Sequence, residues 1–177
     1  MKLTEFFKNK RILVTGSAGT VGSELIKQLL SCFNAGEIIG LDNNETAIHY
    51  SETRFANFTN FHCYLGDVRD RDILIKTMSG IDIVFHCAAF KHVVLCERSP
   101  FEAVQTNIIG IQNIISAAFQ NKVEKVIFTS SDKAVNPSSV MGTSKLMGER
   151  LITAATNARH NPNVTFTSCR FGNVLGS

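Results

Sequence analysis

Short apolar runs rich in β-branched residues alternate along the chain with longer stretches in which apolar residues recur at helical spacing. The short runs predict six strands, at residues 11–15, 37–41, 60–65, 81–87, 125–130 and 164–170. Between them, Val21, Leu25 and Leu29 share one helix face, and further helices are expected over residues 100–119 and 140–159. This alternation predicts an α/β fold with a parallel, doubly wound sheet of Rossmann type, strand order 3-2-1-4-5-6, and a ligand crevice at the carboxyl ends of the strands.

Composition narrows the class of protein. The chain has 177 residues, of which 44% are hydrophobic, enough to bury the core of a single domain spanning residues 1–177. The net charge of +3 is not gathered into a basic stripe, so nucleic acid is not an expected partner. No segment approaches the length of a membrane span, and residues 1–10 lack the apolar centre of a signal peptide. The five cysteines are scattered without a metal-binding spacing, which predicts reduced, mostly buried thiols in a cytoplasmic protein.

The segment TGSAGTVG follows the first predicted strand and opens the first predicted helix. Its glycines let the backbone approach an anion closely, and the helix adds the positive end of its dipole, so the loop predicts a pyrophosphate site. The spacing is GxxGxxG rather than the GxGxxG of most dehydrogenases, and a plain strand-to-helix turn is the alternative. The cofactor contacts expected from this loop are Gly16, Ser17, Gly19, Thr20, Val21 and Gly22.

Two acidic residues close the next two predicted strands. Asp42 ends the second strand, where a carboxylate accepts hydrogen bonds from ribose hydroxyls and repels a 2′-phosphate. NAD is therefore favoured over NADP, which would call for a nearby Arg or Lys. The alternative is that Asp42 only caps the following helix. Asp67 ends the third strand and is expected either to meet the adenine amino group or to serve only as a turn residue.

Five segments taken in order resemble the extended short-chain dehydrogenase/reductase superfamily, namely TGSAGTVGSEL, LGDVRD, HCAAFKHVVLCERSPFEAVQTNIIGIQNII, VIFTSSDKAVNPSSVMGTSK and RFGNVLGS. Within it, the chain is most similar to the nucleotide-sugar (UDP-N-acetylglucosamine) 4,6-dehydratases of bacterial polysaccharide biosynthesis. The resemblance runs from residue 11 to residue 177. Members of that family continue well beyond this length, so the resemblance implies an N-terminal portion that lacks the C-terminal substrate domain.

The resemblance also implies roles for individual residues. Ser131 would hydrogen-bond the sugar C4 oxygen, Lys145 would hold the nicotinamide ribose, and Asp132 and Lys133 would be the acid and base of water elimination. Further cofactor contacts are implied at Val68, Ala88, Ala89 and Asn107, and substrate contacts at Lys91 and Asn173. His86 and Cys87 are expected to pack against the cofactor rather than to react.

One position departs from the wider superfamily. The usual Tyr-x-x-x-Lys pair is here Met141 and Lys145, which still share one helix face at a spacing of four residues. Methionine cannot exchange a proton, so the group that takes the C4 hydroxyl proton has to lie elsewhere. The Ser-Met-Lys arrangement resembles that of a subset of the dehydratases, with Met141 in the catalytic set.

These observations together predict an NAD-dependent lyase that converts a UDP-N-acetylhexosamine into a 4-keto-6-deoxy sugar. Transient oxidation at C4 acidifies the C5 proton and so makes loss of the C6 hydroxyl feasible. The alternatives are a UDP-sugar 4-epimerase and, if the chain is natively this short, a non-catalytic dinucleotide-binding module. The isolated chain is expected to be inactive, and the resemblance suggests a homo-oligomer assembled through the helices that begin at Pro100 and Val140.

Overall fold

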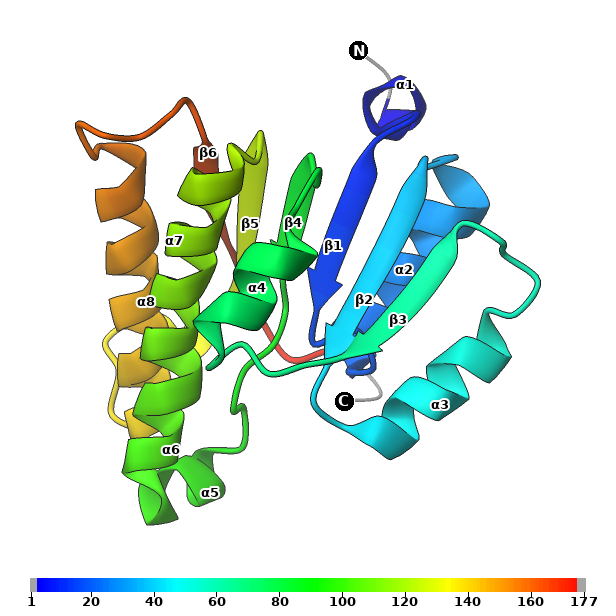
Figure 1. Ribbon diagram of the computed structural model, residues 1–177. Helices are drawn as coiled ribbons and strands as arrows, with labels where there is room; N and C mark the ends of the chain where they lie inside the picture. Colours follow the sequence, from blue (N-terminus) through cyan, green and yellow to red (C-terminus); the bar gives the residue numbers. More distant parts are fainter. Residues whose placement is uncertain (1–2, 175–177) are drawn as a thin grey trace.

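The computed structural model describes residues 3–174, and within them the strands form one parallel six-stranded sheet (Figure 1). The strand order is β3-β2-β1-β4-β5-β6, which confirms the predicted doubly wound topology. The strands are β1 (Arg11–Thr15), β2 (Glu37–Asp42), β3 (Phe61–Leu65), β4 (Ile83–His86), β5 (Lys125–Ser131) and β6 (Thr165–Phe171). Their boundaries lie within a few residues of those predicted, because each buried run is bounded by polar or turn residues.

The helices between the strands cover both faces of the sheet (Figure 1). They are α1 (Leu3–Phe7), α2 (Thr20–Cys32), α3 (Glu45–Arg54), α4 (Arg71–Thr77), α5 (Val93–Arg98), α6 (Pro100–Val104), α7 (Gly110–Asn121) and α8 (Val140–Thr156). A π-helical turn, η1 (Gln105–Ile109), joins α6 to α7, and a 3₁₀ turn, η2 (Asp132–Ala134), follows β5.

Alternating side chains of β1 enter two separate cores. Ile12 and Val14 pack in a core with Ile26 of α2, whereas Leu13 packs on the other face in a core with Ile111 of α7. Successive side chains of a strand point to opposite faces, so a strand covered on both sides is apolar at nearly every position. This explains why the central strands β1, β2 and β4 are nearly continuous apolar runs in the sequence, and why the polar residues of the site gather at the strand ends.

The helix expected over residues 100–119 differs in detail from the one found. It begins at Pro100, which suits a first helical position because proline lacks the amide hydrogen that would stay unpaired there. The π-helical turn η1 then interrupts the α-helical hydrogen bonding before α7 continues to Asn121. Lys122 ends α7 in the left-handed conformation, with φ 53°. The interruption matters because a π turn changes which side chains face the site.

The cysteines correct one expectation. All five are free thiols, as predicted, and Cys63 and Cys96 are buried. Cys32 and Cys169 are exposed, because each lies at a surface position of its element, so burial is less general than the sequence predicted. Among the described helices, none is long and apolar enough to cross a membrane.

Candidate functional site

The glycine loop joins β1 to α2 and keeps side chains away from its backbone. Gly16 has φ +67°, and a Cβ atom there would lie 2.6 Å from the backbone nitrogen of Ala88. A Cβ atom on Gly22 would overlap the Gly16 carbonyl oxygen. Within residues 3–174, no side chain caps the start of α2, so the first-turn amides of Thr20 and Val21 remain available to a ligand. The loop is therefore a bare backbone cradle suited to an anion.

A cleft of about 370 Å³ lies beside this loop, at the carboxyl ends of the parallel strands. The expected cofactor residues that line it are Gly16, Gly19, Thr20, Val21, Gly22, Asp42, Asp67, Val68, Ala88, Ala89 and Lys145. The expected catalytic and substrate residues that line it are Lys91, Ser131, Lys133, Met141 and Asn173. The fold thus brings residues from distant parts of the sequence to the edge where doubly wound sheets bind ligands.

Asp42 connects β2 to the glycine loop. Its Oδ2 accepts a hydrogen bond from the backbone nitrogen of Ala18 at 3.0 Å, and its Oδ1 accepts one from the backbone nitrogen of Asn44 at 3.1 Å. The cap of α3 is Asn44, whose side chain accepts from the backbone nitrogen of Ala47 at 3.0 Å. Asp42 therefore does not cap the helix itself, and its carboxylate stands in the wall of the cleft.

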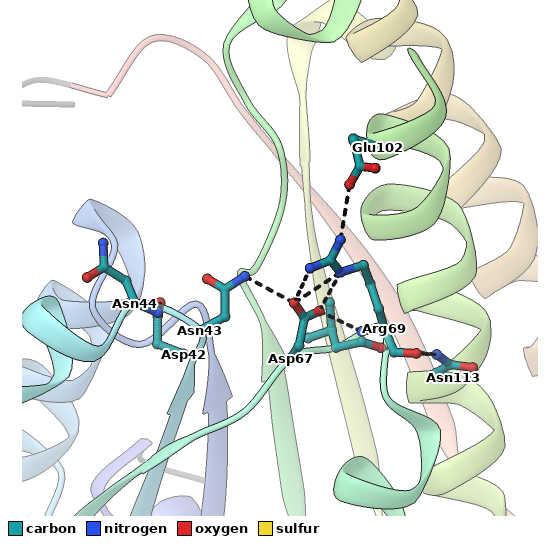
Figure 2. Close-up of polar contacts among 8 residues, drawn as sticks. Asp42, Asn43, Asn44, Asp67, Arg69, Glu102 and Asn113 are labelled. Carbon is teal, nitrogen blue, oxygen red and sulfur yellow. Dashed lines mark hydrogen bonds and ion pairs between the residues drawn. The ribbon is translucent and has the colours of Figure 1, made fainter. Parts of the chain in front are cut away.

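Asp67 also lines the cleft, and its carboxylate is paired with Arg69 (Figure 2). Partial burial acts to raise the pKa of Asp67, but hydrogen bonds from Arg69 and Asn43 outweigh it and hold that pKa below its usual value. Arg69 also donates to Glu102 of α6 at 3.0 Å. Sequence reasoning expected Asp67 here but missed Arg69, although Arg69 follows Asp67 by only two residues in LGDVRD.

Asn107 does not line the cleft but supports the segment that does. Its side chain is buried in η1, where Oδ1 accepts from the Phe90 backbone nitrogen at 2.8 Å and Nδ2 donates to the Phe90 carbonyl at 3.0 Å. Nδ2 also donates to Ser144 Oγ on α8 at 2.9 Å. Asn107 thus joins α8 to the segment after β4 that carries Ala88 and Lys91.

Ser17 also lies outside the lining of the cleft. It is fully buried beneath the glycine loop, and its Oγ is 3.4 Å from Cys63 Sγ on β3. Three residues that the sequence did not single out, Asn43, Thr106 and Thr129, do line the cleft. Each is a neighbour of an expected residue in the sequence or in space, so only the folded chain shows its place.

The polar residues after β5 form a hydrogen-bonded cluster. Ser131 Oγ donates to Asp132 Oδ1 at 2.9 Å, and Lys133 Nζ contacts the same oxygen at 3.4 Å. Lys133 Nζ also lies 3.4 Å from Oδ1 of Asn173, which follows the end of β6 by two residues. The hydrogen bond from Ser131, reinforced by Lys133, lowers the pKa of Asp132. Asp132 itself is exposed at the rim of the cleft, so it reaches the interior through Ser131.

Lys145 and Met141 lie one helical turn apart at the start of α8, and both line the cleft. Lys145 Nζ donates to the Thr129 carbonyl at 2.9 Å and lies 4.9 Å from the centre of the Phe128 ring. Burial lowers the pKa of Lys145 to about 8. Met141 is buried against Cys96 and presents an apolar surface where the wider superfamily has a tyrosine.

His86 is buried at the end of β4, and Cys87, the next residue, is half-buried and lines the cleft. His86 Nδ1 is 2.7 Å from Thr15 Oγ1, and burial lowers its pKa to about 3, so the ring is neutral at pH 7. Burial also raises the pKa of the Cys87 thiol to about 12, which leaves the thiol protonated and a poor nucleophile. Both residues are suited to packing rather than reaction.

Similarity to known proteins identifies the family of this chain. Residues 12–177 match the family described as "Polysaccharide biosynthesis protein". The chain belongs to this family. Among curated relatives, it is 49% identical over 175 residues to an uncharacterized membrane protein of Methanocaldococcus jannaschii. The matched residues cover 99% of this chain and 52% of that protein.

Two other relatives carry named activities. One is a UDP-N-acetylglucosamine 4,6-dehydratase (inverting) of Campylobacter jejuni, 40% identical over 97% of this chain and 51% of its own length. The other is a UDP-glucose 4-epimerase of Rickettsia massiliae, 37% identical over 97% of this chain and 51% of its own length. The chain spans about half the length of the curated relatives it matches.

Solved structures agree with the fold. Pen from Bacillus thuringiensis superposes with a TM-score of 0.94 at 43% identity, covering 97% of this chain and 54% of that one. The dTDP-glucose 4,6-dehydratase DesIV from Streptomyces venezuelae, solved with NAD bound, superposes with a TM-score of 0.82 at 26% identity, covering 90% of this chain and 55% of that one.

Proposed function

We propose that this chain is the NAD-binding half of a nucleotide-sugar 4,6-dehydratase. The residues present suit a dinucleotide. The cradle at Gly16 and Gly22, which added Cβ atoms would fill, leaves room for a pyrophosphate at the start of α2. Asp42 stands at the end of β2, where a carboxylate can meet ribose hydroxyls. The similarity to DesIV, which was solved with NAD, supports this choice of cofactor.

The observation that carries the dehydratase function is the hydrogen-bonded cluster of Ser131, Asp132 and Lys133, of which Ser131 and Lys133 line the cleft, as Lys145 does. Elimination of water needs one group that takes the C5 proton and another that gives a proton to the departing C6 hydroxyl. Epimerisation at C4 needs neither group, because it only oxidises and re-reduces one carbon. The relationship to the Campylobacter jejuni dehydratase supports the same conclusion.

NAD, when bound, supplies the acceptor for the hydride that leaves C4 and the donor of the hydride that arrives at C6. The protein must then supply the groups that accept and donate protons at the C4 hydroxyl, C5 and the C6 hydroxyl. Ser131 donates to the Asp132 carboxylate, whose lowered pKa keeps it ionised in the free protein. A C4 hydroxyl that donates to Ser131 Oγ can pass its proton through that hydroxyl to Asp132. Ser131 and Asp132 together thus provide the proton acceptor that Met141 cannot.

Asp132 and Lys133 then share the elimination step. Asp132 holds the C4 hydroxyl proton as a carboxylic acid and gives it to the C6 oxygen, whose bond to carbon breaks to release water. Lys133, in its uncharged form, takes the C5 proton and later returns it to C5. The proton lost at O4 leaves with the C6 hydroxyl, so the sugar loses one water in total.

The test uses the protein extended to the length of its relatives, incubated with NAD and UDP-N-acetylglucosamine and analysed by mass spectrometry. We expect a nucleotide sugar lighter by one water. A product of unchanged mass whose sugar is the C4 epimer would contradict the dehydratase and identify a UDP-sugar 4-epimerase. Unchanged substrate in a protein that binds NAD would show a non-catalytic dinucleotide-binding module.

A further inference from the structure

The Asp67 carboxylate accepts hydrogen bonds from Arg69, two residues further along the same loop (Figure 2). Arg69 Nε lies 3.0 Å from both carboxylate oxygens, and Nη2 donates to Oδ2 at 2.7 Å. The Arg69 backbone nitrogen adds a further hydrogen bond to Oδ1 at 2.9 Å. Because a guanidinium is planar and presents its donors in a fixed fork, this contact sets the orientation of the carboxylate as well as its charge.

Arg69 is itself anchored to two helices. Its Nη1 donates to Glu102 Oε2 on α6 at 3.0 Å. Asn113 of α7 donates to the carbonyl oxygens of Val68 and Arg69, at 3.1 and 3.0 Å. The loop after β3 is therefore tied to the α6–α7 segment through both its backbone and its side chain, as Figure 2 shows.

The two ends of this arrangement have different surroundings. Asp67 lines the cleft, and its side chain is 24% exposed. Arg69 is not among the residues that line the cleft, and it lies on the outer side of the carboxylate. Asn43 lines the cleft and donates to Asp67 Oδ2 at 3.2 Å, the longest of these hydrogen bonds. Of the donors on Asp67, only Asn43 occupies a position that a ligand in the cleft can take over.

We propose that Arg69 is a positioning residue that orients the Asp67 carboxylate to accept the amino group of the cofactor's adenine. Arg69 acts from behind, through Asp67, and makes no contact with the cofactor itself. Glu102 and Asn113 keep Arg69 and its loop in place. The inference rests on the proposed binding of NAD and adds the residue that sets preference for an amino-bearing base.

The test compares NAD with its deaminated analogue, nicotinamide hypoxanthine dinucleotide, in calorimetric titrations of the chain. Hypoxanthine has a carbonyl in place of the adenine amino group, so it presents an acceptor instead of a donor at the position expected to meet Asp67. The unaltered chain should prefer NAD, and Arg69→Gln should reduce that preference by about three- to tenfold, the range for loss of a partly exposed charge-assisted hydrogen bond. Arg71→Gln, which removes the same charge two residues away, is the matched control and should leave the preference unchanged.

Two results would overturn the inference. One is an unchanged preference for NAD in Arg69→Gln. The other is an equal loss of affinity for both dinucleotides, which would show general damage to the site. If the unaltered chain bound neither dinucleotide, the cofactor proposal would fail instead, and a second measurement decides the role of Arg69.

That second measurement is the titration of the Asp67 carboxyl carbon by nuclear magnetic resonance. The other charged groups around Asp67 are Asp42 at the end of β2, Glu102 on α6, and Asp70, Arg71 and Asp72, which line a shallow hollow together with Asp67. Of the two arginines, only Arg69 hydrogen-bonds the carboxylate, so Arg69 is the cation that lowers its pKa. The pKa of the Asp67 carboxyl should rise in Arg69→Gln and remain unchanged in Arg71→Gln. An Asp67 titration that is the same in Arg69→Gln as in the unaltered chain would show that Arg69 does not hold the carboxylate.

Discussion

A single buried imidazole makes the stability of the fold depend on pH. Burial, with a smaller contribution from the charge of Lys145, lowers the pKa of His86 from 6.5 to about 3. Between these values the unfolded chain binds a proton at this position and the folded chain does not. Stability therefore falls as the pH is lowered from 6.5 toward 3, with each pKa unit worth about 1.4 kcal/mol.

Urea unfolding at several pH values measures this effect. The unaltered chain should lose stability below pH 6.5, and His86→Gln should show a shallower loss. His49→Gln, at an exposed position of α3, is the control and should keep the slope of the unaltered chain. Equal slopes in all three proteins would contradict a buried neutral His86.

We expect Asp42 to determine which dinucleotide the cleft prefers. Its carboxylate lines the cleft, and the nearby Arg69 is committed to Asp67 and Glu102 rather than free to attract a 2′-phosphate. NAD should therefore bind more tightly than NADP, and Asp42→Ala should narrow the difference, with each tenfold change equal to about 1.4 kcal/mol. Calorimetric titration with both nucleotides checks this, and tighter binding of NADP by the unaltered chain would refute it.

The proposed proton-transfer roles of Asp132 and Lys133 can be tested separately in the extended protein. Lys133→Ala should stop the reaction after oxidation at C4, so reduced NAD accumulates and solvent deuterium no longer enters C5. The loss of a general base costs about 10²- to 10⁴-fold in rate. Asp132→Asn should slow oxidation itself, without that accumulation.

Met141→Leu is the matched control, because leucine keeps the volume and apolar character of methionine. It should retain most of the dehydration rate and of the deuterium exchange, followed by mass spectrometry in heavy water. Normal dehydration in Lys133→Ala together with its loss in Met141→Leu would show that the proton transfer has been assigned to the wrong residues.

At the scale of elements, η1 connects the helices to the cleft. Asn107→Ala would remove two hydrogen bonds to the part-buried backbone of Phe90, at a cost of about 0.5–1.5 kcal/mol for each. Gln105→Ala, at an exposed position of the same turn, should cost less than about 0.5 kcal/mol. Urea denaturation measures both, and an Asn107 variant as stable as the Gln105 variant would show that η1 does not hold the Phe90 segment.

The elements also show which features a sequence reveals. The strand order could be predicted because strands and helices alternate along the chain, and because β1, β2 and β4 are buried on both faces and so appear as continuous apolar runs. The glycine loop and the residues after β5 could be placed because they follow those runs directly. The π turn could not, since its cause includes contacts from Asn107 to Phe90 and Ser144, which lie 17 and 37 residues away in sequence. The link from Arg69 to Glu102, 33 residues apart, was hidden for the same reason.

At the scale of the whole molecule, the chain carries the groups that we propose for cofactor binding and proton transfer, and it spans about half of its relatives' length. We expect the isolated chain to bind NAD and to show little or no turnover of UDP-N-acetylglucosamine, because much of the sugar-nucleotide pocket should come from the remaining half. Mass spectrometry of the nucleotide sugar after incubation checks this. Efficient loss of water with this chain alone would contradict the expectation.

Titration of the isolated chain with NAD tests the central claim most directly, because binding requires the folded cleft and its glycine cradle. The account predicts saturable binding of one NAD per chain and a loss of at least about tenfold in Gly22→Ala, whose added Cβ would overlap the Gly16 carbonyl oxygen. Gly36→Ala, whose added Cβ would crowd the backbone of Asn9 at a position outside the lining of the cleft, is the control and should bind NAD as the unaltered chain does. Absence of saturable binding by the unaltered chain, or equal affinity in Gly22→Ala, would contradict the account.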